Sequence, residues 1–201
     1  MDLKEKLYAS TKENIGDKGI RNFTLYILNH APERFWTDPC SSSGRNHPPE
    51  DQNDVTEGGI VRHILKGTAI CPQLCRFFNV SEQDYDITLS AWTLHDIKKN
   101  GDPWTDRTNY QHGLIAYRWL EQFPLEKEKK DKIRNGVRYH MGQWVQPEEE
   151  KPLATSPTTN ELIVQLTDYF CSRKDASFLP GIGLNEEQIE KFSSKPYSLK
   201  E

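Results

Sequence analysis

Apolar residues recur at helical spacing along several stretches of this 201-residue chain, and no stretch shows the sustained alternation expected of a half-buried strand. One such stretch contains Tyr85, Ile87, Leu89, Trp92 and Leu94. A helix with an apolar stripe is stable only when that stripe is buried against other elements. The pattern therefore predicts an all-α helical bundle without strands.

Local signals mark the ends of several expected helices. Ser81 is a good N-cap, Thr158 and Glu161 form a plausible capping box, and Pro72 is expected to kink or divide the helix that contains it. His30 is expected to close an early helix. The ranges expected for the main helices are 60–78, 82–99, 109–122, 125–141 and 160–173, after two shorter apolar stretches near residues 7–8 and 23–28.

The length suits one domain, whose core we expect at about residues 45–175. A long loop at 36–59 is rich in Ser, Pro, Asn, Asp and Gly, and such loops are usually functional or disordered. Residues 147–157 are expected to be a polar connector. Residues 176–201 are expected to be a loosely packed tail with one short helix near 186–192.

The net charge and the lack of long apolar runs limit the partners and the cell compartment that we expect. The 26 basic and 30 acidic residues give a formal net charge of −4, which offers no general attraction for nucleic acid or an anionic membrane. No apolar run approaches the roughly twenty residues of a membrane span, and the start lacks the apolar segment of a signal peptide. We therefore expect a cytoplasmic protein that does not bind membranes. Its oligomeric state is left open.

The four cysteines are too few and too scattered for a disulfide framework, so we expect them to be reduced. Cys71 and Cys75 lie four residues apart on an expected helix. They lack the second pair that a zinc site would need, so they are interpreted as small buried residues.

The histidines suggest a metal site. His63, His95, His112 and His140 fall in apolar-periodic segments, and Asp96 directly follows His95. Another carboxylate, Asp168, lies within an apolar helix, where burying it without a partner would be costly. Imidazole and carboxylate ligands suit manganese, iron, cobalt, nickel or zinc better than calcium. Adjacent residues lie about 100° apart around a helix, so His95 and Asp96 can converge only at a helix edge.

These residues, in this order, resemble the HD superfamily of metal-dependent phosphohydrolases. Glycines 58 and 59 lead into a helix that carries His63, His95-Asp96 is followed by Lys99, and Asp168 lies far downstream. The resemblance covers about residues 45–175. Asp168-Tyr169-Phe170-Cys171-Ser172-Arg173 is also similar to a segment of some members with two metal ions.

The resemblance implies roles for these residues. His63, His95, Asp96 and Asp168 would hold one divalent ion, with manganese, iron, cobalt, nickel, zinc or magnesium as candidates. Asp96 would bridge to a second ion held by His112 and His140. Asp96 and Lys99 are the expected catalytic residues. The residues expected to bind substrate phosphate are Lys99, Arg62, Arg138 and His47.

For some residues a second interpretation stays open. His112 and His140 could be hydrogen-bonded core residues of a mononuclear site, and His47 beside two prolines could mark only a turn. The loop containing Ser41–Ser43 could form a phosphate-binding nest or be an ordinary loop. Trp92, Trp119 and Trp144 are interpreted as core residues.

The resemblance implies hydrolysis of a phosphoester or phosphoanhydride bond, and the acidic charge favours a small nucleotide over a long nucleic acid. Three alternatives remain: a catalytically silent nucleotide-binding sensor, an RNA 3′-end phosphodiesterase of the same fold, and a helical interaction protein without metal.

Overall fold

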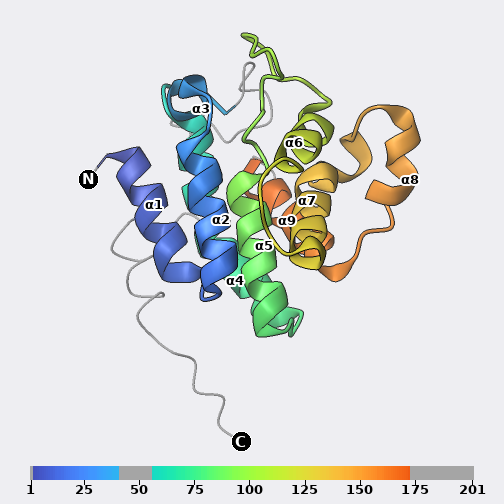
Figure 1. Ribbon diagram of the computed structural model, residues 1–201. Helices are drawn as coiled ribbons and strands as arrows, with labels where there is room; N and C mark the ends of the chain where they lie inside the picture. The colour runs from blue at the N-terminus through green and yellow to red at the C-terminus, as the bar shows by residue number, and fades with distance from the viewer. Residues whose placement is uncertain (1, 41–55, 173–201) are drawn as a thin grey trace, which may run out of the picture.

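The computed structural model describes residues 2–40 and 56–172, which form helices and turns without a strand (Figure 1). The prediction of an all-α fold is confirmed. The expected tail and most of the 36–59 loop lie outside the described residues.

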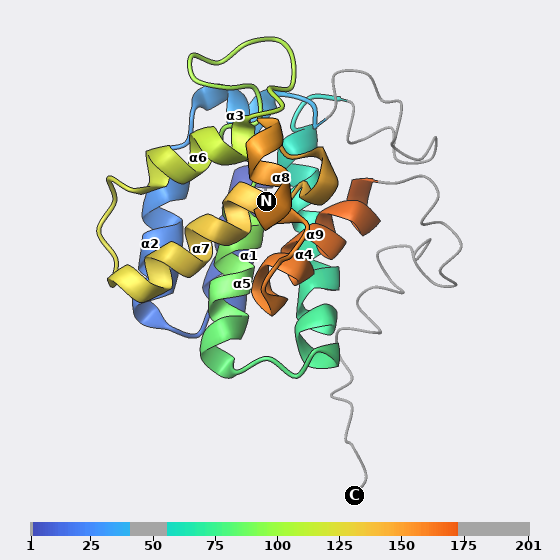
Figure 2. The ribbon, with the colours of Figure 1, turned by 90° about the vertical axis from the view of Figure 1, so that its right-hand side faces the viewer.

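One helix, α5 (Glu82–Leu94), forms the centre of the bundle, and its residues from Asp86 to Leu94 are all buried. In both ribbon views other helices surround it (Figures 1 and 2). These neighbours are α2 (Lys18–Asn29), α4 (Gly59–Phe77), α7 (Lys127–Tyr139) and α9 (Thr159–Ser172).

Shorter elements complete the bundle. α1 and α3 pack against α4, and α6 packs along α7. Their bounds are α1 (Leu3–Asn14), α3 (Glu33–Thr37), α6 (His112–Leu120) and α8 (Lys151–Ala154), with 3₁₀ turns η2 (Gly142–Trp144) and η3 (Glu148–Glu150). The expected connector at 147–157 thus contains two short helical elements.

The predicted helix ends are largely confirmed. Ser81 accepts a hydrogen bond from the backbone of Asp84, and His30 closes α2. Thr158 donates its backbone N–H to the Glu161 carboxylate and receives the Glu161 N–H at its hydroxyl, as a capping box requires. Pro72 does not divide α4, which is 19 residues long and continues through this proline. One missing backbone hydrogen bond is tolerated in a helix this long and this well packed.

One boundary differs in a way that matters for the site. The helix expected to reach Lys99 ends at Leu94, and the chain continues in tight turns. Backbone N–H groups there bond to carbonyls three residues earlier, as in Ile97 to Leu94 and Lys99 to Asp96. This winding is tighter than that of an α-helix. His95 and Asp96 therefore lie in the turns at the end of α5 and not within the regular α-helix that was expected.

The contact of α4 with α5 depends on a glycine. A Cβ atom at Gly67 would overlap the indole of Trp92, whose Nε1 donates to the Ile64 carbonyl at 2.9 Å. Only a residue without a side chain lets the two helices approach this closely.

We expect Gly67→Ala to lower the free energy of unfolding by about 1–3 kcal/mol, because overpacking outweighs the helix propensity that alanine adds. Urea unfolding measures this, with Gln73→Ala on the exposed side of α4 as the control. Unchanged stability of Gly67→Ala would mean that the indole can move aside.

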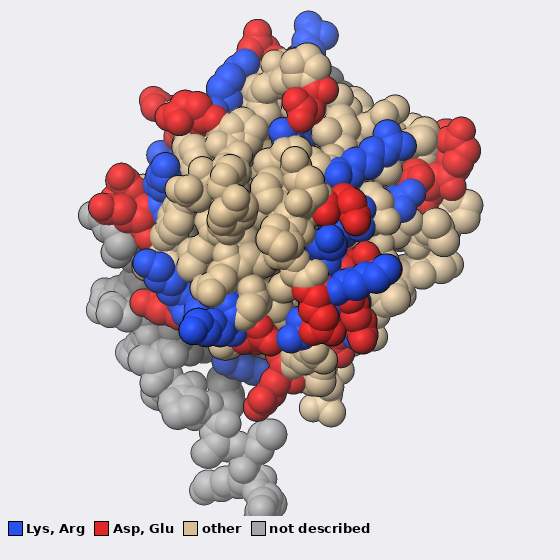
Figure 3. Space-filling view, in the orientation of Figure 1, with Lys and Arg blue, Asp and Glu red and all other residues tan. Residues whose placement is uncertain are grey.

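Basic and acidic side chains are interspersed on the face shown in Figure 3, and neither sign forms a continuous field there. Ion pairs among the described residues include Lys129 with Asp17 and Lys132 with Asp84. No helix among residues 2–40 and 56–172 is long and apolar enough to cross a membrane.

Candidate metal centre

Five segments that are distant in sequence bring histidines and aspartates together in the bundle. α4 carries His63, the turn after α5 carries His95 and Asp96, and α9 carries Asp168. His112 begins α6 and His140 directly follows α7. The four histidines and Asp96 are buried, whereas the Asp168 side chain is 18% exposed.

Hydrogen bonds to the backbone determine the tautomer of three of these histidines. In each, Nδ1 lies within 2.7 Å of the carbonyl oxygen three residues earlier. A carbonyl only accepts, so Nδ1 must carry the proton, and in the neutral ring Nε2 carries a lone pair. The pairs are His95 with Trp92, His112 with Asn109, and His140 with Val137.

These three Nε2 atoms converge on the carboxylate of Asp96. His95 Nε2 lies 3.3 Å from Oδ2, while His112 and His140 Nε2 lie 3.1 Å and 3.6 Å from Oδ1. The Nε2 atoms of His112 and His140 are only 2.9 Å apart. Lone pairs and an anion facing one another away from water repel. A cation relieves this repulsion, so the residues fit a metal site.

Hydrogen bonding within the site supports the same conclusion. Among the described residues, His95 Nε2 and Asp96 Oδ1 are buried and have no well-formed hydrogen bond. Buried polar atoms without such partners are rare and need an explanation. A divalent ion bound to both atoms would provide one.

The pKa values differ between two of these imidazoles. Burial would lower the pKa of His95, but the carboxylates of Asp96 and Asp168 outweigh burial and raise it. Burial, followed by the charges of His112 and His95, lowers the pKa of His140 to about 3. His140 is therefore neutral at physiological pH, as a metal ligand must be.

A second group of donors lies beside the first. His63 Nε2 is 3.0 Å from Asp168 Oδ1, and His95 Nε2 is 3.9 Å from the same oxygen. Burial acts to raise the pKa of Asp168, but the hydrogen bond and charge of His63 hold it well below its ordinary value. Asp168 is therefore negatively charged and lies beside the imidazoles of His63 and His95.

Two overlapping groups consist of histidines and aspartates alone, each with its ligand atoms within 4.8 Å of one another. They are His63 with His95 and Asp168, and His95 with Asp96 and His140. Metal bonds to nitrogen and oxygen are about 2.0–2.2 Å long, so two ligand atoms of one ion lie up to about 4.4 Å apart, close to the spacing within each group.

The HD domain family matches residues 60–173, more than half of the chain and the part that contains all six of these histidines and aspartates. The chain belongs to the HD domain family. Comparison with curated proteins and with solved structures found no match. HD domains bind divalent metals and form a superfamily of metal-dependent phosphohydrolases, so the His–Asp cluster is compatible with an HD metal site.

Lys99 follows the HD pair and lies beside it. Its Nζ is 2.8 Å from Asp96 Oδ2, and its side chain is 13% exposed. Burial would lower the pKa of Lys99, but Asp96 and other nearby anions raise it well above its ordinary value. Lys99 therefore keeps a positive charge next to the His–Asp cluster.

The two other described residues of this HD domain that were expected to bind phosphate, Arg138 and Arg62, each contact another group of the protein. Arg138 holds the Glu150 carboxylate with two bonds of 2.6 Å and lies over the rings of Tyr117 and Tyr139. A phosphate would have to compete with that carboxylate. Arg62 donates to the backbone carbonyl of Glu57, next to the start of α4. His47 and the Ser41–Ser43 segment lie outside the described residues.

Sequence reasoning missed the placement of Cys40. Its sulfur lies within 4.8 Å of ligand atoms of His63 and Asp96, and the residue is buried. Cys40 lies far from the other candidate ligands in sequence and belongs to no recognisable ligand spacing. Only the fold shows that it lies beside them.

The interpretation of Trp144 as a core residue is wrong. Trp144 is 45% exposed and stacks on Tyr169, which is 41% exposed, at 6.4 Å between ring centroids and 14° between planes. It belongs to η2, a turn outside the packed helices. Trp92 and Trp119 do pack in or against the core.

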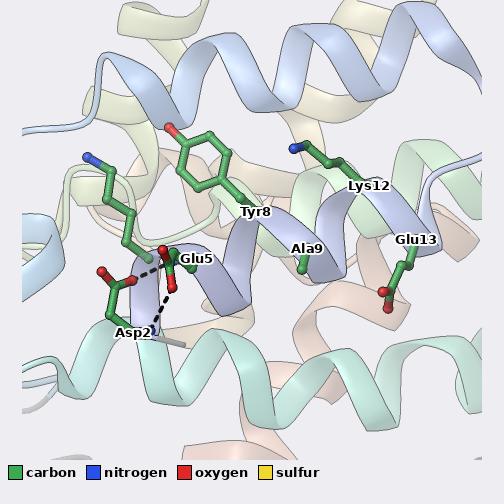
Figure 4. Close-up of a pocket in the computed structure, with 7 residues that line it drawn as sticks. Asp2, Glu5, Tyr8, Ala9, Lys12 and Glu13 are labelled. Atoms are coloured by element: carbon green, nitrogen blue, oxygen red, sulfur yellow. Dashed lines mark hydrogen bonds between the residues drawn. The ribbon is translucent and has the colours of Figure 1, made fainter.

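The hollow shown in Figure 4 is a separate feature. Seven residues of one N-terminal segment line it, and Asp2 and Glu5 cap the helix there. None of the metal-site residues contributes to it. A second hollow, lined by Thr105, residues 107–111 and Gln146, lies just before His112.

Proposed function

We propose that this HD domain hydrolyses a phosphoester or phosphoanhydride bond of a nucleotide with water activated at a divalent metal centre. The observation that carries the proposal is the convergence of three imidazole Nε2 atoms on the buried Asp96 carboxylate. Such an arrangement is unfavourable without a cation and suits one well.

The ligands divide between two ions. His63, His95, Asp96 and Asp168 would hold the first, and His112 and His140, with Asp96 as the bridge, would hold the second. Bound ions would supply Lewis acidity, which makes water a better nucleophile at neutral pH and neutralises charge on the phosphate.

The protein holds these donors in place and leaves the side chains of Asp168 and Lys99 partly exposed, where a phosphate can approach. Asp168 and Lys99 keep exposed fractions of 18% and 13%, whereas the other ligands are almost fully buried. The Lys99 ammonium is therefore well placed to bind a phosphate oxygen that arrives at this side.

The stacked pair of Trp144 and Tyr169 supports a nucleotide substrate. Tyr169 directly follows Asp168 in α9, and exposed aromatic rings bind nucleobases by stacking. The net charge of −4 is in keeping with a small substrate rather than a polymer.

A panel of phosphate compounds tests this function. Phosphate release is measured for nucleoside monophosphates and triphosphates, with ribose 5-phosphate as the matched substrate without a base. We expect chelation to silence the protein, and manganese, cobalt, nickel or zinc to restore it better than calcium. Nucleotides should be preferred to ribose 5-phosphate.

Other outcomes of the same panel would contradict the proposal. Nucleotide binding without phosphate release under any metal would indicate a sensor, and cleavage restricted to RNA 3′ ends would indicate a phosphodiesterase. Rescue by calcium alone would contradict the imidazole–carboxylate site.

A further inference from the structure

We propose that Cys40 supplies a thiolate ligand to the metal centre and that this ligand shifts the centre's preference toward zinc, iron or cobalt and away from manganese and magnesium. The inference rests on the metal site of the proposed function. It adds a donor that the HD ligand pattern in the sequence does not contain.

The distances place Cys40 within an ion's reach. Its sulfur and one ligand atom each of His63 and Asp96 all lie within 4.8 Å of one another. Zinc bonds are about 2.3 Å to sulfur and about 2.0–2.2 Å to nitrogen and oxygen, so two such donors of one ion lie up to about 4.5 Å apart, close to the spacing in this group. His63 and Asp96 each belong to a further ligand group as well. Cys40 would therefore join the existing centre rather than form another.

The fold holds Cys40 there by anchoring the residues just before it. The Asp38 carboxylate accepts hydrogen bonds from Asn100 Nδ2 at 3.0 Å and Trp104 Nε1 at 2.8 Å, both in the turns that follow Asp96. The Asp38 carbonyl accepts the N–H of Ile60 at the start of α4. This segment is thus tied both to the His63 helix and to the His95-Asp96 turn.

The other cysteines provide a contrast within the same chain. Cys71, Cys75 and Cys171 are buried on α4 and α9, and none of them joins a ligand group among residues 2–40 and 56–172. Cys40 is the one described cysteine grouped with an imidazole and a carboxylate. Cys75→Ala therefore serves as a matched control that removes a buried thiol from elsewhere.

The consequence for metal choice follows from ligand softness. Thiolate binds zinc, iron and cobalt well, whereas manganese and magnesium prefer oxygen donors. We expect Cys40→Ala to weaken zinc binding by about tenfold or more, the scale of effects around metal sites, and to change manganese binding much less.

Cobalt substitution tests the inference without using activity. The full chain is loaded with cobalt, and its absorption spectrum is compared with those of Cys40→Ala, Cys40→Ser and Cys75→Ala. Wild type and Cys75→Ala should show a sulfur-to-cobalt charge-transfer band in the near ultraviolet. Both Cys40 variants should lose this band and keep the visible bands of bound cobalt.

X-ray absorption of the zinc-loaded wild type tests the same ligand without a substitution, so a folding defect in a variant cannot affect the result. One sulfur at about 2.3 Å from zinc is expected. A shell of nitrogen and oxygen alone, with zinc bound, would overturn the role of Cys40 and leave the proposed function intact. A wild-type chain that binds neither zinc nor cobalt would overturn both.

Discussion

His95→Ala and Asp96→Asn should each reduce hydrolysis by about 10³-fold or more, on the scale of losses seen when charge-stabilising groups are removed. His95→Ala removes an imidazole that lies 3.3 Å from the Asp96 carboxylate, and Asp96→Asn removes the negative charge that the three imidazoles face at 3.1–3.6 Å. Asp96→Asn is the cleaner variant because it keeps the shape of the side chain. His95→Ala also removes a ring that stacks on Trp92.

Metal analysis and steady-state kinetics check this prediction together. Asp102→Ala is the matched control, because Asp102 lies in the same turn region but is half exposed and pairs only with Lys98 among the described residues. The control should keep both metal and activity. Full activity in both His95→Ala and Asp96→Asn, with normal circular dichroism, would remove the metal centre from the reaction.

His140→Ala should lower the bound metal from about two ions to about one per chain and sharply reduce turnover, because water would lose one of two Lewis acids. The reason lies in the pairing of His140 with His112. Their Nε2 atoms lie 2.9 Å apart beside Asp96 Oδ1, and the low pKa of His140, about 3, keeps its ring neutral.

His30 provides the control for this experiment. Its Nδ1 also lies close to a carbonyl oxygen, that of Tyr26 at 2.8 Å, but it closes α2 and belongs to no described ligand group. His30→Ala should leave metal content unchanged. A count of about one ion in both wild type and His140→Ala would contradict the binuclear interpretation and remain consistent with the four-ligand site. Unchanged metal with a substrate-dependent loss of activity would assign His140 to phosphate binding.

The local features of this chain were determined by the sequence itself. Apolar spacing specified the helices because a helix of period 3.6 must bury one side. The caps at Ser81 and at Thr158 with Glu161 depend on residues three positions apart, so they can be identified without a fold. The candidate metal ligands were proposed partly for a related reason, since a buried histidine or aspartate needs a partner wherever it lies, and their roles came from the resemblance to the HD superfamily.

Tertiary structure decided everything that joins distant segments. The convergence of His112 and His140 on Asp96 depends on how α6 and α7 meet the turn after α5. The engagement of Arg138 by Glu150 depends on the path of a connector that carries no strong pattern. Cys40 reaches His63 only because Asp38 ties its segment to α4 and to the turn after α5. Contacts of this kind are set by packing between elements, which no local spacing encodes.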